Sequence, residues 1–374
     1  MTLLDSRPVQ PATRPIDWLA ARSEGIMPFG SILLHSPSFA FQAPGGGENQ
    51  LIQTGKSLES LGIPVRLFSP WTDRLERARL LHLFGMSHEG LELARIARRR
   101  GIPVVLSPIC WYQPQAIWTL EPSLRRKVGG LARWGIRSIA PRLRGWRREL
   151  LGLSNAILPN SRAEANQLIR LFALDPDKVH IVPNGISAHF ALADPAPFRS
   201  VYGSRPFVLS VGRIEPRKNT LELVRATRKL DLPLVVIGNP VDAFTNYAQQ
   251  CHREGGTGIT WIGNRDYLDP LLASAYAAAR VFALPSWFET PGLAALEAAL
   301  AGCPVVITPY GSTREYFGNS ATYARPHRLG EITGAIQDCW RLGKNSRLSE
   351  FMASRYLWPV VAQRTAEIYD QVTG

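Results

Sequence analysis

The stretch Phe282–Gly302, FALPSWFETPGLAALEAALAG, joins a short apolar strand, a polar loop and a helix rich in Ala and Leu. Glu289 and Glu297 lie eight residues apart across the junction of loop and helix, with Pro291-Gly292 between them. Eight residues of helix rise about 12 Å and return to nearly the same face. This spacing predicts two carboxylates that contact separate parts of one elongated polar ligand.

Glu297 interrupts a run of Ala and Leu that is typical of a buried helix, and a buried carboxylate needs hydrogen-bond partners. The same pattern also fits an ordinary helix with a surface Glu289 and a satisfied core Glu297. The segment alone leaves both interpretations open, and the rest of the chain favours the ligand.

Length and composition indicate a large globular protein. With 374 residues and 45% hydrophobic residues, the chain is too long for one typical core, so we expect two domains. No stretch approaches the roughly 20 apolar residues of a membrane span, and residues 1–27 lack a signal-peptide pattern and predict a loose tail. The 4 cysteines are scattered without a CxxC pair, which argues against a zinc site or disulfides and suits a reducing cytoplasm.

The net charge of +13 concentrates in Arg125–Arg148, which holds nine basic residues, no acidic residue, and both Trp134 and Trp146. Basic side chains mixed with Trp and Leu favour an anionic membrane surface or an anionic acceptor. The alternative is a solvated face of an arginine-rich protein. Nucleic-acid binding is less favoured, because no RNA- or DNA-binding motif accompanies the charge, and we expect no nucleic-acid partner.

Short apolar strands alternate with helical stretches, which is typical of a parallel α/β fold. In the first half, strands are expected at residues 31–35, 65–69, 79–84, 104–107, 156–159 and 180–182, with helices around 49–61, 89–100 and 162–172. In the second half, strands are expected at residues 207–211, 234–237, 259–262, 281–284 and 305–307. Two such domains place a cleft at the carboxyl ends of both sheets, where ligands bind.

A Pro- and Gly-rich stretch between the two halves predicts a linker at residues 191–206. It separates a first domain, residues 28–190, from a second domain, residues 207–350. Residues 351–374 predict a pair of helices broken near Trp358-Pro359.

Gly45-Gly46-Gly47-Glu48 follows the first predicted strand and opens a helix, whose N-terminus favours an anion. A flexible turn is the alternative. A dinucleotide-binding GxGxxG motif and a Walker A motif would each need glycine at position 50, where the chain has Gln50. Neither a dehydrogenase nor a P-loop nucleotidase is supported.

The segment Val211–Asn219, VGRIEPRKN, follows the first strand of the second half. Arg213 at the end of that strand and Lys218 at the start of the next helix predict a clamp for a diphosphate. A basic surface turn is the alternative, and it fits Arg217 better than its neighbours. Asp175-Pro176-Asp177 has the spacing of a metal-binding motif but predicts a turn, and no metal is expected because the histidines form no ligand cluster.

The Gly45–Glu48 loop, the VPNGI stretch at 182–186, the GRIEPRKN stretch at 212–219 and the Glu289-x7-Glu297 element occur in this order. Together they resemble a GT-B glycosyltransferase of family 4, over nearly the whole chain. The resemblance implies two Rossmann-like domains facing across a cleft, with C-terminal helices at 351–374 that cross back to the first domain. It also implies a nucleotide-diphosphate sugar as donor, bound mainly by the second domain, and retention of anomeric configuration without a metal ion.

The resemblance also implies roles for individual residues. Arg213 and Lys218 would hold the diphosphate, Glu297 the ribose hydroxyls, and Glu289 the transferred sugar or the positive charge near its anomeric carbon. The remaining donor-binding residues act near the phosphates (Gly46, Gly47, Gly292 and Leu293) and near the nucleobase (Gly263, Asn264 and Arg265).

Two features depart from the family pattern. Thr290-Pro291-Gly292 stands where Gly-Phe-Gly is frequent, and Pro291 has no N–H to offer a phosphate. The segment 107–110 lacks the histidine that often contacts the sugar there, and His88 is a candidate substitute.

The expected activity is transfer to a saccharide or lipid-linked acceptor in surface polysaccharide synthesis, in the cytoplasm or peripherally at the inner membrane face. A nucleotide-sugar 2-epimerase of the same architecture is the alternative.

Overall fold

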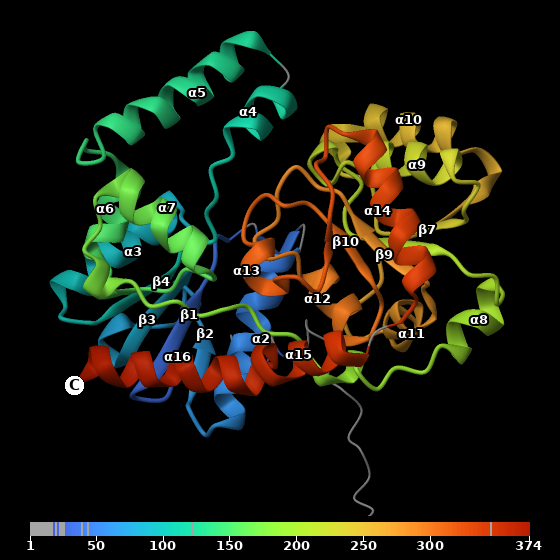
Figure 1. Cartoon of the computed structure of the whole chain (residues 1–374). Coiled ribbons are helices and arrows are strands. Elements are labelled where there is room, and N and C mark those ends of the chain that lie inside the picture. Colours follow the sequence, from blue (N-terminus) through green and yellow to red (C-terminus); the bar gives the residue numbers. More distant parts are fainter. Residues whose placement is uncertain are drawn as a thin grey trace, which may run out of the picture.

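The computed structural model describes Trp18, Ala21 and residues 27–38, 40–42, 45–121, 123–344 and 346–374. This part of the chain forms two parallel sheets flanked by helices, which confirms the expected α/β fold (Figure 1). Most strands are short and mainly apolar, and β9 is buried along its whole length, as parallel strands covered on both faces require.

The first sheet has the order β2-β1-β3-β4-β5. Its strands are β1 (Ser31–His35), β2 (Val65–Leu67), β3 (Ala78–Phe84), β4 (Val104–Ser107) and β5 (Ala156–Ile157). The accompanying helices are α2 (Gly46–Ser60), α3 (His88–Arg99), α4 (Pro114–Leu120), α5 (Leu124–Ile139), α6 (Trp146–Leu153) and α7 (Arg162–Phe172).

The second sheet has the order β11-β10-β9-β6-β7-β8. Its strands are β6 (Val208–Val211), β7 (Leu234–Ile237), β8 (Ile259–Ile262), β9 (Val281–Leu284), β10 (Val305–Ile307) and β11 (Thr322–Tyr323). The helices around it are α8 (Ala196–Tyr202), α9 (Thr220–Lys229), α10 (Thr245–Gly255), α11 (Pro270–Ala278), α12 (Leu293–Leu300), α13 (Thr313–Phe317), α14 (Leu329–Leu342) and α15 (Ser346–Tyr356).

The strand order reverses direction between β1 and β3 in the first sheet and between β6 and β9 in the second. Ligands of open parallel sheets bind outside the carboxyl ends of the strands at such a reversal. The loops that leave β6 and β9 carry the predicted diphosphate clamp and Glu289, so the second sheet places both at its reversal point.

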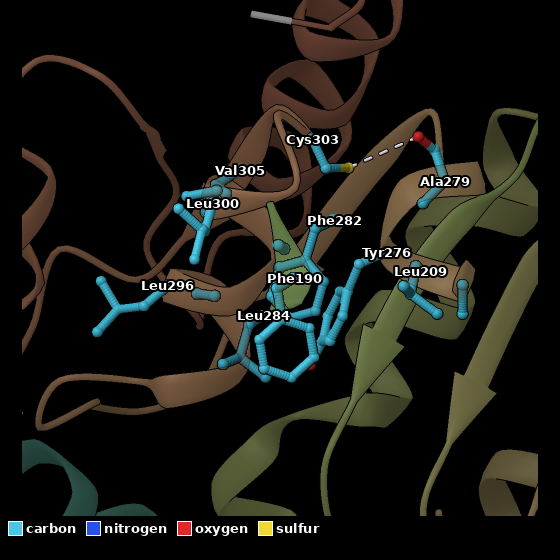
Figure 2. Packing of buried hydrophobic residues seen from close by; sticks show 14 of the residues in the cluster. Phe190, Leu209, Tyr276, Ala279, Phe282, Leu284, Leu296, Leu300, Cys303 and Val305 are labelled. Carbon is cyan, nitrogen blue, oxygen red and sulfur yellow. Dashed lines mark hydrogen bonds between the residues drawn. The ribbon is translucent and has the colours of Figure 1, made fainter. Parts of the chain in front are cut away.

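An aromatic core lies under the second sheet and holds α11 and α12 against it. The ring of Tyr276 lies 5.5 Å from that of Phe190 and 5.8 Å from that of Phe282, between ring centroids. Figure 2 shows these rings beside Leu296 and Leu300 of α12. The core therefore fixes the helix that carries Glu297.

The last helix, α16 (Trp358–Thr373), crosses back to the first sheet and packs on α2 and β3 (Figure 1). The ring of the buried His82 joins this helix to the sheet, because Nδ1 lies 2.6 Å from the Tyr369 hydroxyl and Nε2 lies 3.0 Å from the Ser107 hydroxyl. Where the chain returns, Ile186 of the outgoing connection pairs with Leu357. The predicted crossing of the C-terminal helix is confirmed.

The structure corrects several predicted boundaries. Residues 180–182 form no strand, because pairing with β5 is limited to a bridge at Val179 and Pro183 has no N–H for a ladder. The predicted linker at 191–206 contains α8, which packs on α11. Of the two C-terminal helices, α15 packs on α12 of the second half, and only α16 reaches the first sheet.

Most of the predicted tail at 1–27 lies outside the described residues. Trp18, however, is buried in the first core and donates a hydrogen bond from Nε1 to Glu59 at 2.8 Å. The strand β11 was not predicted, because two half-exposed residues give no apolar run. Asp175 caps the short 3-10 turn Pro176–Lys178, as the turn interpretation predicts.

The described residues contain no helix that is long and apolar enough to cross a membrane. All four cysteines are free, and Cys110 is the least buried of them.

Candidate functional site

Lys218 and Glu289 form a close ion pair where the loops after β6 and β9 meet. The Lys218 ammonium donates to Glu289 Oε1 at 2.6 Å, and the Glu289 side chain is only 5% exposed. Lys218 ends the 3-10 turn η5 (Pro216–Lys218), while Glu289 lies in the loop before α12. Two predicted site residues that are 71 positions apart thus share one point in space.

Burial and charge act in opposite directions on this pair. Burial alone would raise the pKa of Glu289, but the cations Lys218 and Arg217 outweigh it, and the net effect lowers that pKa. Burial lowers the pKa of Lys218, and the attraction of Glu289 offsets part of this effect. Glu289 is therefore an ionised carboxylate at neutral pH, suited to stabilising positive charge rather than to donating a proton.

The two arginines beside Lys218 have positions that differ from the sequence-based interpretation. Arg217, which was assigned to a surface turn, lies 3.7 Å from Glu289 and donates to Glu215 at 3.0 Å. Arg213 is the more exposed of the two at 48%, and its contact is with Glu215 at 3.7 Å. The cationic cluster beside Glu289 therefore consists of Lys218 and Arg217, with Arg213 at its outer edge.

The backbone of Glu289 is fixed by the loop that follows β10. Its N–H donates to the carbonyl of Tyr310 at 3.1 Å, and its carbonyl accepts from Ser312 at 2.9 Å. Gly311 lies between these partners with φ +98°, and a methyl group on it would lie 2.0 Å from the Glu289 carbonyl oxygen. Only glycine allows the two loops to approach this closely.

The N-termini of α2 and α12 approach each other across the two halves of the molecule. A methyl group added at Gly46 would lie 3.5 Å from Leu293 Cδ1. Gly292 caps α12 with φ +88°, and Gly47 faces Ile109 of the β4 loop. The four residues predicted to face phosphates thus belong to two neighbouring helix starts, and a helix N-terminus favours an anion.

Glu297 lies on α12 and is directed into the aromatic core. Its Oε2 accepts a hydrogen bond from the Tyr276 hydroxyl at 2.7 Å, and the residue is 5% exposed. Burial raises the pKa of Glu297 to about 7, although the Tyr276 hydrogen bond opposes this. Because α12 begins at Leu293, Glu289 lies outside the helix, and the two glutamates share no helix face.

The raised pKa of Glu297 predicts a pH-dependent stability. A carboxyl whose pKa is higher in the folded state binds more protons there, so the free energy of unfolding falls as the pH rises from the ordinary value of 4.5 towards about 7. The expected fall is about 3 kcal/mol for this group, and the buried Glu164, with its pKa also raised to about 7, adds to it.

We expect Glu297→Gln to remove the part of the fall that Glu297 contributes and to leave the part from Glu164, because the amide has no proton to lose and its oxygen still accepts from Tyr276. Urea unfolding of both proteins at pH 5, 6 and 7 measures the effect. Parallel pH profiles for variant and wild type would show that Glu297 is already ionised in the folded protein.

The residues predicted to border the nucleobase lie at the carboxyl end of β8, two strands away from β6. Gly263 and Asn264 are exposed, and the Asn264 N–H donates to Asn239 Oδ1 at 2.9 Å. Arg265 contacts Asp269 at 3.5 Å. These residues keep their predicted place at the sheet edge but do not contact the Lys218–Glu289 pair.

The loop that lacks the family histidine is held by buried side chains of α7. The Glu164 carboxylate accepts the N–H groups of Cys110 at 2.6 Å and of Asn160 at 2.8 Å. Ile109 in this loop has φ +47° and faces Gly47. His88 is exposed and lies 4.4 Å from the Trp146 ring, between centroids, so its contact is with α6.

Contacts between α13 and the start of α7 join the two halves of the molecule, and the sequence did not predict them. The hydroxyls of Ser161 and Ser312 lie 2.7 Å apart, and the Glu315 carboxylate accepts the N–H of Arg162 at 2.8 Å. The buried Tyr316 hydroxyl donates to the Asn160 carbonyl at 2.6 Å. A carboxylate stabilises a helix N-terminus. Here Glu315 belongs to α13, far along the chain from the start of α7, so local sequence could not predict the contact.

Among the residues that the structure describes, no three His, Cys, Asp or Glu side chains gather as metal ligands do. The expectation that the chain needs no metal stays a prediction.

Two family models match the chain. The model described as "Glycosyl transferase 4-like domain" matches residues 38–185, and the model described as "Glycosyl transferases group 1" matches residues 197–337. The first match begins just after β1 and covers β2 to β5, and the second covers β6 to β11, so each model corresponds to one of the two sheets.

Curated and solved relatives agree with these models. D-inositol 3-phosphate glycosyltransferase 2 of Catenulispora acidiphila is 29% identical over 60% of this chain, which spans 57% of that relative's length. Sucrose-phosphate synthase of Thermosynechococcus elongatus has a TM-score of 0.73 at 18% identity, covering 91% of this chain and 98% of that one.

HepE of Anabaena, solved in complex with UDP-glucose, has a TM-score of 0.67 at 18% identity, covering 91% of this chain and 99% of that one. At such identities the solved structures support the fold alone. The family models support the activity class. The chain belongs to the family 4 glycosyltransferases and has the GT-B fold.

Proposed function

We propose that this glycosyltransferase moves a sugar from a nucleotide-diphosphate sugar to a saccharide acceptor, with retention of anomeric configuration and without a metal ion. The observation that carries the proposal is the buried Lys218–Glu289 pair at the reversal point of the second sheet. HepE, whose solved complex contains UDP-glucose, shares the fold and makes a nucleotide sugar the donor class of choice.

In this proposal Lys218, with Arg217 and Arg213, neutralises the donor diphosphate and the charge that develops on it as it leaves. The amides at the start of α2 and α12 contribute further positive potential. These groups supply the charge that a divalent cation supplies to diphosphates in other transferases, which supports independence from metal.

Glu289 then faces the anomeric carbon. Its lowered pKa keeps it ionised, so it stabilises the positive charge of the sugar in the transition state. The incoming diphosphate competes with Glu289 for Lys218, which leaves the carboxylate available to the sugar. Glu297 binds the ribose hydroxyls at the other end of the donor, after its Tyr276 contact rearranges.

We further propose that the acceptor is a lipid-linked saccharide of surface polysaccharide synthesis and that the chain works at the inner face of an anionic membrane, reached through the basic segment 125–148. The absence of acidic residues from this segment supports an anionic partner.

The test is a transfer assay with a panel of nucleotide sugars and saccharide acceptors, in buffer with and without excess EDTA. We expect product at equal rates in both buffers, and NMR of the product should show the anomeric configuration of the donor. An inverted product, or activity that EDTA abolishes and Mg²⁺ restores, would overturn the proposal. Release of free nucleotide diphosphate with no acceptor requirement would instead identify a nucleotide-sugar epimerase.

A further inference from the structure

The helices α4 and α5 form a hairpin that stands apart from both sheets (Figure 1). None of the described residues of α5 is buried, although the helix is 16 residues long and carries several large apolar side chains. A helix of this length that keeps its apolar side chains in water needs a partner for them.

The apolar side chains of α5 share one face. Leu124 is 66% exposed, Val128 54%, Ile136 51% and Ile139 88%. At 100° per residue, these four positions fall within an arc of about 120°. They form what we term the α5 ridge, defined by these four residues.

The α5 ridge points away from the body of the protein. The opposite side of the helix makes the contacts with the first domain, because Trp134 packs on its core and the Arg137 guanidinium lies 5.3 Å from the Phe172 ring centroid. Trp146 also packs on that core. An amphipathic helix normally turns its apolar side to the core, and α5 does the reverse.

Exposed arginines accompany the ridge, with Arg125 inside its arc and Arg126 and Arg133 on one side of it. Arg125, Arg126 and Arg133 are exposed on α5, and Arg142 and Arg144 are exposed just beyond it. An apolar ridge bordered by arginines matches an anionic lipid surface, where the apolar side chains enter the acyl region and the arginines reach the headgroups. A second copy of the chain would present the same positive charges and repel.

The hairpin also borders the candidate site. The helix α4 packs against η5, the turn that carries Lys218, and α4 packs against α5 on its other side. A lipid surface on the α5 ridge therefore lies near the mouth of the cleft, on the side of the donor diphosphate.

We propose that the α5 ridge docks the protein on an anionic membrane and thereby brings lipid-linked acceptors to the cleft. The inference rests on the proposed function for the nature of the acceptor. It narrows the docking surface from the whole segment 125–148 to one face of α5, since both tryptophans of that segment pack inward.

The experiment measures sedimentation of the full chain with vesicles of phosphatidylcholine alone and with about 30% phosphatidylglycerol, in the absence of donor. We expect binding to the anionic vesicles only. Ile136→Asp with Ile139→Asp should lower the partition coefficient by about tenfold or more, because two apolar contacts are lost and two negative charges are added.

The matched control is Leu192→Asp with Val201→Asp, which adds the same charges at apolar side chains that are 85% and 63% exposed outside the hairpin. This control should bind as the wild type does, and all three proteins should have equal thermal shifts with nucleoside diphosphates, which shows an intact donor site. Equal losses in both double variants would overturn the ridge, as would wild-type binding that ignores lipid charge.

Self-association provides the second readout. If the α5 ridge were an interface between two copies, wild-type protein would dimerise without lipid and the Ile136→Asp, Ile139→Asp variant would be monomeric. That outcome would replace the membrane with a second chain. Sugar transfer to a soluble saccharide without vesicles should be unaffected by the two substitutions. If the wild type and both double variants all lack this activity, the proposed function is wrong, whereas the docking result still tests the ridge.

Discussion

Replacing Lys218 with methionine is expected to lower the rate of sugar transfer by about 10²–10³-fold, because the charge closest to the proposed diphosphate is lost. The free energy of unfolding at pH 7 should also fall, by about 3 kcal/mol, since the buried Glu289 then keeps Arg217, at 3.7 Å, as its nearby cation. Steady-state transfer kinetics and urea unfolding measure the two effects.

The stability effect has a defined pH dependence. In the wild type the pKa of Glu289 is lowered, so its contribution to stability is present above the unfolded pKa and is lost as the pH falls through the folded value. The difference between the Lys218→Met variant and the wild type should therefore shrink in acid, where the stranded carboxylate takes up a proton.

A double variant separates the two roles of Lys218. Adding Glu289→Gln to Lys218→Met should restore most of the stability, because neither charge is then buried alone, and should restore no activity. Lys218→Met with normal donor affinity and normal turnover would contradict the assignment of Lys218 to the diphosphate.

Replacing Glu289 with glutamine is expected to lower kcat by about 10²-fold or more while the Kd for the donor changes little. The substitution keeps the shape of the side chain, removes the negative charge from the proposed anomeric site, and frees Lys218 for the diphosphate. Single-turnover kinetics and calorimetric titration with the donor measure chemistry and binding separately.

Glu297→Gln is the matched comparison, since it makes the same change on the other glutamate. A ribose ligand should affect the donor Kd more than kcat, which is the opposite pattern. If Glu289→Gln loses donor binding in proportion to its loss of turnover, then Glu289 holds the donor and has no separate role at the reacting carbon.

The sequence predicted the elements that are defined by local composition. The strands β1, β4, β7, β8, β9 and β10 have the predicted bounds, because each is an apolar run with a clear turn on both sides. The strand at 180–182 was wrong, since an apolar stretch next to Pro183 resembles a strand although it pairs with only one residue. Strands of a sheet that is covered on both faces show no alternation of apolar and polar residues, so the sequence cannot separate a true strand from a short apolar stretch that stays unpaired.

At the candidate site, the sequence predicted Lys218 and Glu289 as site residues but not the contact between them, and their roles stay predictions. Both residues follow strands, and the order of the strands in the sheet, which decides that the two loops meet, is a property of the fold. Arg217 was misassigned for the same reason, because exposure within a turn depends on the neighbouring loop. Tyr276 as the partner of Glu297 lies 21 residues away and carries no signal in the sequence.

The basic segment shows the same division between composition and geometry. The charge of residues 125–148 was readable, and the expectation of an anionic partner follows from it. The direction in which α5 turns its apolar side chains could not be predicted from the sequence. Trp134 and Ile139 are both apolar, and they differ in what packs against them.

The most direct test of the central claim is a crystal structure of the chain with a bound nucleotide-diphosphate sugar. We expect the diphosphate oxygens within hydrogen-bond distance of Lys218, the ribose hydroxyls on Glu297, and the sugar against Glu289. A donor bound away from the ends of β6 and β9, with the Lys218–Glu289 and Tyr276–Glu297 contacts unchanged, would contradict the account.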